Sequence, residues 1–311
     1  MLAPTDKSTR ETVLSIDWWT DVLFCLTISR PPDYRFTPGQ FSRLGLPAPP
    51  LDGSAGAVRQ QAPFDVLWRA YSITSATADT QLEYYGIAVP DGAFTSAVRQ
   101  LKRGDPILLD KVPNGFLTID RFTGGDDLWM LATGTGLGPY IALLRDPAVW
   151  RRFGKLVLVH GVRHGRELAY QATLASLAAQ AATRTDCARL YVVQATTRES
   201  VSAPVSAPVN QSGMTSTSLP STRPAIALAP DGLPDPANQP ALARLQGRIT
   251  TLLASGMLEA AAGLAMSPET SRILLCGNPA MIDDMRGLLQ LRGFLPVRRA
   301  QPGHFMAENY W

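Results

Sequence analysis

The sequence is short of several features that would place it in a special class. Only three of its 311 residues are cysteines, at positions 25, 187 and 276, and this spacing supports neither a disulfide framework nor a metal site. No apolar run approaches the roughly 18 residues that a membrane span needs, and the opening MLAPTDKSTRE lacks a signal-peptide pattern. The net charge of +3 is too small for a nucleic-acid binder but suits an acidic protein partner or a phosphate-bearing ligand. We therefore expect a cytoplasmic protein that binds neither membrane nor nucleic acid.

The first 123 residues have the pattern of an all-β domain. Short apolar runs are separated by turns rich in proline, glycine and aspartate, which is typical of an antiparallel sandwich or barrel. The expected strands are residues 22–28, 40–46, 70–74, 82–89, 106–111 and 115–119.

Residues 124–311 have a different pattern. Nearly continuous apolar runs at 128–132, 155–160, 190–195 and 272–276 are expected of strands buried on both faces. Helical stretches at 167–182 and 279–291 separate them, the second with Asn278 as N-cap and Pro279 at its first position. Alternating strands and helices predict a parallel α/β sheet.

Residues 200–244 fit neither pattern. They are rich in proline, serine, threonine and alanine, nearly uncharged, and without periodicity. Such composition favours a disordered, solvated insertion without a catalytic role, and a segment that docks a partner is the alternative.

Arg69-Ala70-Tyr71-Ser72 is the first motif that carries chemistry. On a strand, Arg69 and Tyr71 share one face, so an arginine that can hold a pyrophosphate lies beside a ring that can stack. Taken alone, the four residues also fit a half-buried strand with a surface arginine.

A glycine-rich turn follows the strand at 128–132. Its sequence ATGTGLGP brings bare backbone N–H groups to the start of a helix, where they can hold phosphate. A second strand-to-helix turn, CGNPAM, begins at Cys276. Because ligands of open parallel sheets lie beyond the carboxyl ends of the strands, both turns are expected in one crevice.

Three arginines follow other predicted strand ends: Arg163, Arg198 and Arg248. One such arginine is normally just solvated, whereas several in one crevice form an anion site suited to the 2′-phosphate of NADP.

Taken in order, these motifs make the chain resemble the bacterial ferredoxin/flavodoxin–NADP⁺ reductases. The resemblance is carried by FTPGQF (36–41), RAYS (69–72), VPDG (89–92), ATGTGLGPY (132–140), TRE (197–199) with GR (247–248), LCGNPAM (275–281) and the terminal AENYW. It covers the whole chain apart from residues 200–244 and a smaller insertion near 47–62. The resemblance implies an antiparallel six-stranded Greek-key β-barrel for FAD (residues 1–123), followed by a Rossmann-like parallel α/β domain for NADP (residues 124–311).

The resemblance also implies roles for individual residues. Those expected to bind FAD are Arg69, Ala70, Tyr71, Ser72, Tyr85, Gly86, Ile87, Ala88, Ala93, Phe94, Thr95, Thr135, Tyr310 and Trp311. Those expected to bind NADP(H) are Thr135, Gly136, Arg163, Arg198, Arg248 and Asn278. Ser72, Cys276, Glu308 and Tyr310 are expected at the site of hydride transfer, with Tyr310 over the flavin face opposite Tyr71.

The function that the resemblance implies is hydride transfer between NADPH and FAD, followed by one-electron exchange with ferredoxin or flavodoxin. We expect a monomer with an acidic electron-carrier partner. The alternatives are the reductase component of an oxygenase, a free-flavin reductase, and a flavin-binding electron-transfer subunit of a larger complex.

Overall fold

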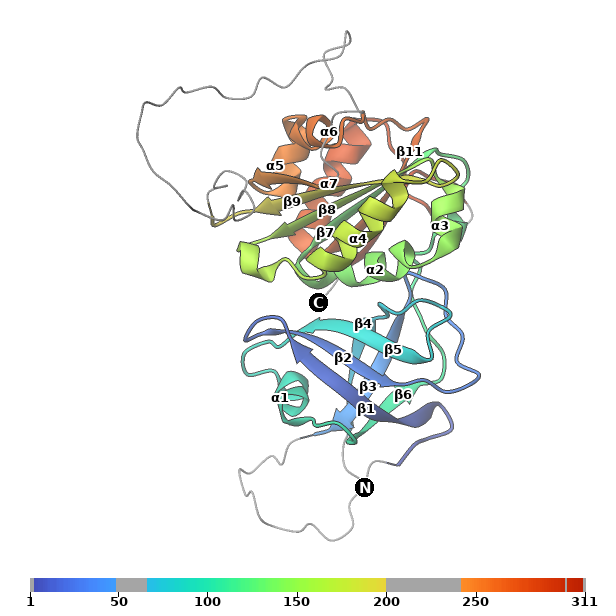
Figure 1. Ribbon diagram of the computed structural model, residues 1–311, viewed down its shortest axis with the longest axis vertical. Helices are drawn as coiled ribbons and strands as arrows, with labels where there is room; N and C mark the ends of the chain where they lie inside the picture. The colour runs from blue at the N-terminus through green and yellow to red at the C-terminus, as the bar shows by residue number, and fades with distance from the viewer. Residues whose placement is uncertain (1–2, 49–65, 200–241, 300, 310–311) are drawn as a thin grey trace, which may run out of the picture.

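The structure, a computed structural model, describes residues 3–48, 66–199, 242–299 and 301–309. Figure 1 shows a β-barrel and an α/β domain stacked along the long axis of the molecule. The two meet through a continuous apolar contact, in which Leu23, Tyr85 and Leu117 of the barrel side pack with Leu137 and Tyr140 of the α/β domain. Within the described ranges, no helix is long and apolar enough to cross a membrane.

The barrel is a six-stranded antiparallel sheet with the strand order β4-β3-β6-β1-β2-β5. An isolated bridge between Ile73 and Tyr84 joins the two ends of this order. Alternate side chains point inward and fill the core, among them Phe24, Leu26 and Leu44. The elements are β1 (Ser8–Trp18), β2 (Leu23–Ser29), β3 (Phe41–Pro47), β4 (Val66–Ser72), β5 (Gln81–Ile87), α1 (Ala93–Gln100) and β6 (Pro106–Asp110), followed by the 3₁₀ turn η1 (Ile119–Arg121).

The α/β domain is a six-stranded parallel sheet with the order β10-β9-β8-β7-β11-β12. Its strands are β7 (Asp127–Thr133), β8 (Lys155–Val162), β9 (Arg189–Thr196), β10 (Leu242–Gln246), β11 (Ser271–Gly277) and β12 (Phe305–Asn309). Its helices are α2 (Gly138–Leu144), α3 (Pro147–Arg152), α4 (Gln171–Ala182), α5 (Ile249–Ala254), α6 (Met257–Ala262) and α7 (Pro279–Leu291), with 3₁₀ turns η2 (Gly134–Leu137) and η3 (Gly165–Glu167).

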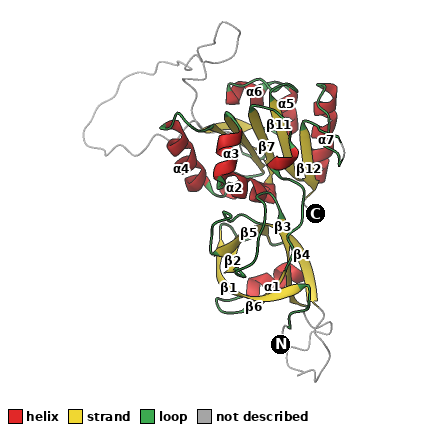
Figure 2. Ribbon diagram, turned by 90° about the vertical axis from the view of Figure 1, so that its right-hand side faces the viewer, coloured by secondary structure: helices red, strands yellow, loops and turns green. Residues whose placement is uncertain are grey.

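Helices cover both faces of the parallel sheet (Figure 2). On β7, Leu128, Met130 and Ala132 pack toward α2, α3 and α4. Trp129 and Leu131 of the same strand pack toward α5, α6 and α7. Both faces of the strand are therefore buried, which explains its nearly continuous apolar sequence.

The predicted fold class is confirmed, but several predicted elements are wrong. Residues 115–119 form no strand, because the chain there makes a single bridge from Asn114 to Phe41 and then turns into η1. Strands β1, β10 and β12 are absent from the prediction. Residues 242–244, expected within the insertion, belong to β10, which pairs in parallel with β9. Most of the predicted insertion, residues 200–241, lies outside the described residues.

The prediction for α7 is confirmed. The helix spans Pro279–Leu291, and the side-chain oxygen of Asn278 accepts hydrogen bonds from the backbone N–H groups of Ala280 and Met281. The other predicted helix begins later than expected, at Gln171, because residues 165–167 form the short turn η3 instead.

Candidate functional site

The strand β4 presents the RAYS motif at the edge of the barrel. Arg69 and Ala70 are exposed, whereas Tyr71 and Ser72 are buried. The Tyr71 ring packs against Phe94 in the first turn of α1, with 5.7 Å between ring centroids, and against Phe24 at 6.1 Å. The structure thus brings the RAYS strand and the predicted 93–95 segment together. It leaves only 8% of Tyr71 exposed, so its stacking on a flavin stays a prediction.

The start of α1 fits a phosphate group. Its N-cap is Gly92, which offers no side chain to the free N–H groups of the first turn, and that turn holds no acidic residue. Thr95 instead donates its hydroxyl to the carbonyl oxygens of Val89 and Gly92. Backbone donors at a helix start, together with the exposed Arg69, are the groups that hold a diphosphate. The residues of the barrel therefore fit a flavin dinucleotide.

The predicted FAD segment 85–88 forms the end of β5 and the residue after it. Tyr85, Gly86 and Ala88 are buried and Ile87 is half-buried. A Cβ on Gly86 would lie 2.6 Å from the Phe24 ring and 2.7 Å from the Tyr71 ring, so the close packing of both rings requires glycine here. The Tyr85 hydroxyl is buried and has no hydrogen-bond partner among the described residues.

The glycine-rich turn lies where the parallel sheet meets the barrel. It forms η2 after β7, and the turn from Cys276 to Asn278 lies directly against it. A Cβ on Gly136 would lie 2.3 Å from the carbonyl oxygen of Cys276. The Thr133 hydroxyl accepts a hydrogen bond of 2.8 Å from the backbone N–H of Asn278. The two turns that the sequence places in one crevice are therefore in direct contact.

A buried histidine forms a hydrogen bond with the glycine-rich turn. His160 on β8 contacts the Gly134 carbonyl oxygen at 3.0 Å through its Nε2. Burial lowers the pKa of His160 to about 4, so the ring is neutral at physiological pH and donates its Nε2 proton to that carbonyl. The sequence prediction missed this residue, because a histidine inside an apolar run looks like part of the core.

The three predicted anion-binding arginines come together at one edge of the sheet. Their strands β8, β9 and β10 are neighbours, with Thr196 paired to both Val162 and Gln246. The Arg198 N–H donates to the Arg163 carbonyl at 3.0 Å, and the Gly247 N–H beside Arg248 donates to the Thr196 carbonyl at 2.9 Å. All three arginines are exposed.

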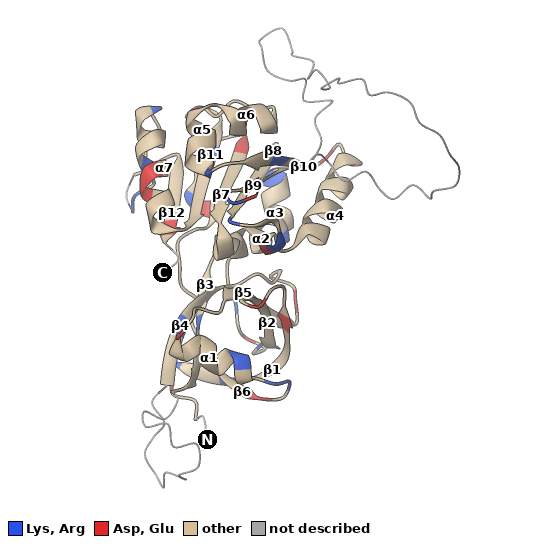
Figure 3. Ribbon diagram, turned by 90° about the vertical axis from the view of Figure 1, so that its left-hand side faces the viewer, with Lys and Arg blue, Asp and Glu red and all other residues tan. Residues whose placement is uncertain are grey.

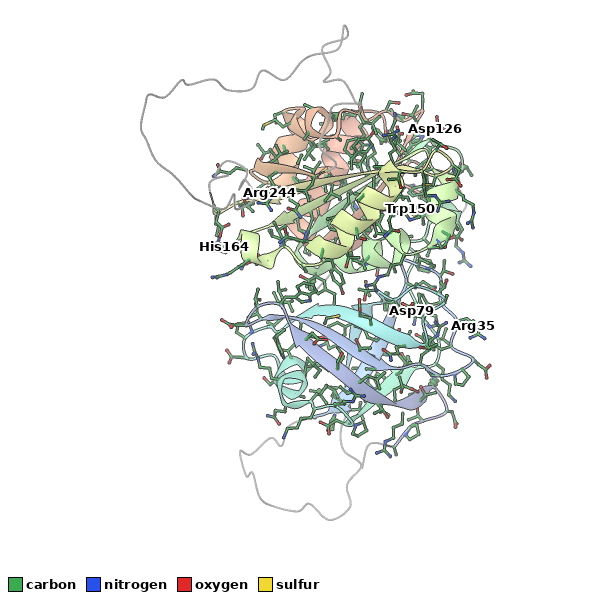
Figure 4. All side chains as sticks on the ribbon, viewed as in Figure 1. Arg35, Asp79, Asp126, Trp150, His164 and Arg244 are labelled. Carbon is green, nitrogen blue, oxygen red and sulfur yellow. The ribbon has the colours of Figure 1, made fainter. Side chains whose placement is uncertain are left out.

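Three further polar side chains lie on this flank of the α/β domain. His164 approaches Glu199 at 3.4 Å, and Arg244 projects from β10 on the same side (Figure 4). Glu199 also accepts a hydrogen bond from the Gly165 N–H at 2.7 Å. The flank therefore holds cations from three strand ends and one carboxylate that fixes the η3 turn beside them.

A cleft of about 1270 Å³ opens between the barrel edge and the end of β12. Of the predicted site residues, Ala70 and Glu308 line it. Four arginines that the sequence prediction missed also line it: Arg43, Arg121, Arg286 and Arg299. Tyr310 and Trp311 follow the last cleft-lining residue, Asn309, and lie outside the described residues.

Glu308 and Cys276 are register partners on β12 and β11. Burial raises the pKa of the Glu308 carboxyl to about 7, although the Phe116 backbone N–H opposes this shift. Burial, and to a lesser degree Glu308, also raise the pKa of the Cys276 thiol well above its usual value. Cys276 is a fully buried, neutral thiol.

We expect Glu308→Gln to change how stability depends on pH. The folded-state pKa of Glu308 is raised above its ordinary 4.5, so its stabilising contribution is complete below about pH 4.5 and is lost as the pH rises through about 7. Relative to the parent protein, the variant should gain stability with rising pH, by up to about 3 kcal/mol above pH 8. Urea unfolding of both proteins between pH 4 and pH 9 measures the difference. Glu269→Gln is the control, since the pKa of that exposed carboxyl is lowered, and a pH-independent difference for Glu308→Gln would contradict the assignment.

The α/β domain matches the model of the oxidoreductase NAD-binding domain over residues 130–209, which defines the general class. Over 304 residues, the chain is 33% identical to the ferredoxin–NADP reductase A of Sorangium cellulosum, covering 97% of this chain and 89% of that protein. It is 32% identical to the ferredoxin–NADP reductase of Azotobacter vinelandii, covering 96% of each. The ferredoxin NADP⁺ reductase of Neisseria gonorrhoeae, solved with bound FAD and NADP, superposes with a TM-score of 0.75 at 30% identity, covering 98% of this chain and 99% of that one.

The chain therefore belongs to the ferredoxin/flavodoxin–NADP⁺ reductase family.

Proposed function

We propose that this protein is an FAD-dependent ferredoxin/flavodoxin–NADP⁺ reductase. One observation carries the proposal: Arg163, Arg198 and Arg248, far apart in sequence, meet at neighbouring strand ends of the sheet whose glycine-rich turn packs against the barrel. These arginines and the glycine-rich turn lie at the same carboxyl edge of the sheet, which supports an anion site beside a turn suited to a dinucleotide. The membership of the family supports the same conclusion.

The barrel residues would hold FAD. The exposed Arg69 and the backbone N–H groups of Ala93, Phe94 and Thr95 at the start of α1 would bind its diphosphate, because guanidinium groups and the N–H groups of a helix start are donors to anions. Tyr71 would pack against the flavin, Ser72 would lie near its reactive edge, and the backbone of 85–88 would line it, with Thr135, Tyr310 and Trp311 completing the site. Bound there, FAD would supply the chemistry of hydride acceptance from NADPH and of one-electron release.

The α/β residues would hold and orient NADPH. Arg163, Arg198 and Arg248 would bind the 2′-phosphate, while Thr135, Gly136 and Asn278 would line the path of the nicotinamide. His160 would keep the glycine-rich turn in place through its bond to Gly134. Cys276 would act as a small, buried wall of this site, and Glu308, half-buried at the cleft, would hold or release a proton near neutral pH.

The cleft would receive the electron carrier. Its four arginines are only partly neutralised, since Arg43 lies 3.7 Å from Asp110 and Arg286 lies 3.4 Å from Asp283. Arg121 lies over the ring of Phe116, an aromatic that is 74% exposed, at 4.9 Å. Figure 3 colours lysine and arginine blue and aspartate and glutamate red along the ribbon. A basic rim around an exposed aromatic suits an acidic partner such as ferredoxin or flavodoxin.

The remaining assignments belong to the same proposal. The protein would act as a cytoplasmic monomer, with an FAD domain ending near residue 123 and an NADP domain after it.

The absorption spectrum of the purified protein tests the proposal. We expect a yellow protein whose flavin bands are bleached by NADPH within seconds and far more slowly by NADH. Steady-state rates with ferredoxin, flavodoxin and free FMN then identify the acceptor. A colourless protein would contradict the cofactor, and a clear preference for free FMN would favour a flavin reductase instead.

A further inference from the structure

A polar network joins the barrel to the α/β domain at one point. Glu83 on β5 is its centre, since its Oε1 accepts three hydrogen bonds: 2.8 Å from the Thr74 hydroxyl, 3.0 Å from Arg145 and 2.9 Å from the Tyr170 hydroxyl. Arg145 also donates to the Thr74 carbonyl at 2.8 Å. Arg145 caps the end of α2 and Tyr170 precedes α4, so residues at the ends of two helices of the α/β domain bind one carboxylate of the barrel.

The strand β2 contributes a thiol to this network. Phe24 and Leu26 of β2 fill the barrel core, whereas Leu23 packs with the α/β domain. Cys25 shares the face of Leu23, as the alternation of a strand requires, and its Sγ lies 3.5 Å from the Tyr170 hydroxyl. Burial, and secondarily the Glu83 charge, raise the pKa of Cys25 to about 12. Cys25 is therefore protected by the contact between the two domains.

Tyr170 is held in an unusual backbone conformation. Its φ of 57° lies in the left-handed region, which a bulky residue adopts at a cost of about 1–3 kcal/mol. Three contacts fix it there: the hydroxyl bond to Glu83, the Trp19 ring at 5.3 Å and the Tyr85 ring at 5.6 Å. All three partners lie on the barrel, and Tyr85 begins the segment assigned to FAD. Such strain persists only where the surrounding structure determines the position of the residue.

We propose that Glu83, Arg145 and Tyr170 form an interdomain clamp that sets the orientation of the α/β domain on the barrel and hence the approach of the nicotinamide to the flavin. The proposal rests on the proposed function for its catalytic consequence. These are positioning residues, since none of them lies among the groups assigned to either dinucleotide. Orientation matters here because a misplacement of about 1 Å can slow a reaction about 100-fold.

Arg145→Met tests the clamp. We expect the rate of flavin reduction at saturating NADPH to fall at least about 10-fold, with the KM for NADPH changed less than about twofold, because Arg163, Arg198 and Arg248 are untouched. Arg145→Lys, which keeps the charge, should recover part of the rate. Chemical reduction of the flavin by dithionite should be unchanged, since it does not depend on the orientation of the nicotinamide.

The thiols provide a readout that is independent of turnover. In the purified holoprotein, iodoacetamide alkylation followed by peptide mass spectrometry should show Cys25 reacting at least about 10-fold faster in Arg145→Met. Cys276, fully buried in the α/β domain, should react at the parent rate, which excludes general unfolding as the cause.

Arg292→Met is the matched control. Arg292 also bonds one carboxylate and one carbonyl, Glu259 at 2.9 Å and Leu253 at 2.8 Å, but both partners lie within the α/β domain. This variant should leave the reduction rate and the Cys25 reactivity unchanged. The clamp is refuted if Arg145→Met and Arg292→Met behave alike, or if Cys25 and Cys276 become reactive together. A parent protein that NADPH does not reduce would refute the proposed function instead, and the alkylation result would still decide whether the clamp exists.

Discussion

Replacing Arg198 and Arg248 together with alanine is expected to raise the KM for NADPH about 100-fold while the KM for NADH stays within about twofold. Each hydrogen bond to a charged group contributes about 1.5–3 kcal/mol, and exposed guanidinium groups give the lower value. Two such losses amount to about two powers of ten in affinity. NADH has no 2′-phosphate, so its binding does not use these contacts.

Arg189→Ala is the control for the double variant. Arg189 begins β9 and is exposed, but it lies at the opposite end of the strand from Thr196 and the arginine group. Its removal should leave both KM values unchanged. Steady-state oxidation of NADPH and NADH by the three proteins measures the effect. An equal rise in the KM for NADPH and for NADH would show that these arginines do not recognise the 2′-phosphate.

Replacing Gly136 with alanine is expected to abolish most NADPH-dependent reduction. The added methyl group would lie 2.3 Å from the Cys276 carbonyl oxygen and 2.6 Å from its carbon, and these backbone atoms sit in β11 and cannot yield without moving the strand end. Overpacking of this kind costs about 1–3 kcal/mol of stability. The larger effect should be on catalysis. The rate of NADPH-dependent reduction should fall about 100-fold or more, because the glycine-rich turn and the turn after β11 would be pushed apart.

Gly287→Ala serves as the comparison for Gly136→Ala. Gly287 lies in the exposed face of α7, and a Cβ there meets no atom within 4 Å. Alanine should stabilise this helix by up to about 1 kcal/mol and leave activity unchanged. Thermal unfolding and the rate of flavin reduction separate the two effects. A Gly136→Ala protein with parent-like reduction would show that the turn tolerates displacement.

The elements that the sequence predicted correctly have strong local signals. The strands β7, β8, β9 and β11 are apolar on both faces because both faces are covered, and α7 begins with an asparagine cap and a proline. The missed strands lack such signals. β1 carries Arg10, Glu11 and Asp17 among its apolar residues, and β10 and β12 are five-residue edge strands with exposed positions. Their pairing is decided by neighbours far away in the sequence, so no local pattern reveals them.

The same distinction applies to the site. Arginines that follow strand ends and glycines that precede helices can be assigned to the site from the sequence alone, because a parallel sheet brings the carboxyl ends of its strands to one edge. No local sequence pattern identifies Glu83, Arg145 and Tyr170 in this way. Arg145 and Tyr170 lie 62 and 87 residues after Glu83 in the sequence, and their meeting depends on how the α/β domain packs against the barrel. The arginines of the cleft likewise come from both units, so their grouping is a property of the assembled molecule.

The parallel pairing of β9 and β10 has a consequence for protein engineering. β9 ends at Thr196, and β10 begins at Leu242, which is the register partner of Val192. The connection between the two strands therefore has to span only the length of four strand residues, about 13 Å. An extended chain covers that distance in fewer than about ten residues. Residues 197–241 far exceed this requirement, and the sheet fixes both ends of the connection whatever its length. A sensor module spliced into this connection would be tethered beside Arg198 and Arg248, where a change in its own shape could be converted into a change in reductase output.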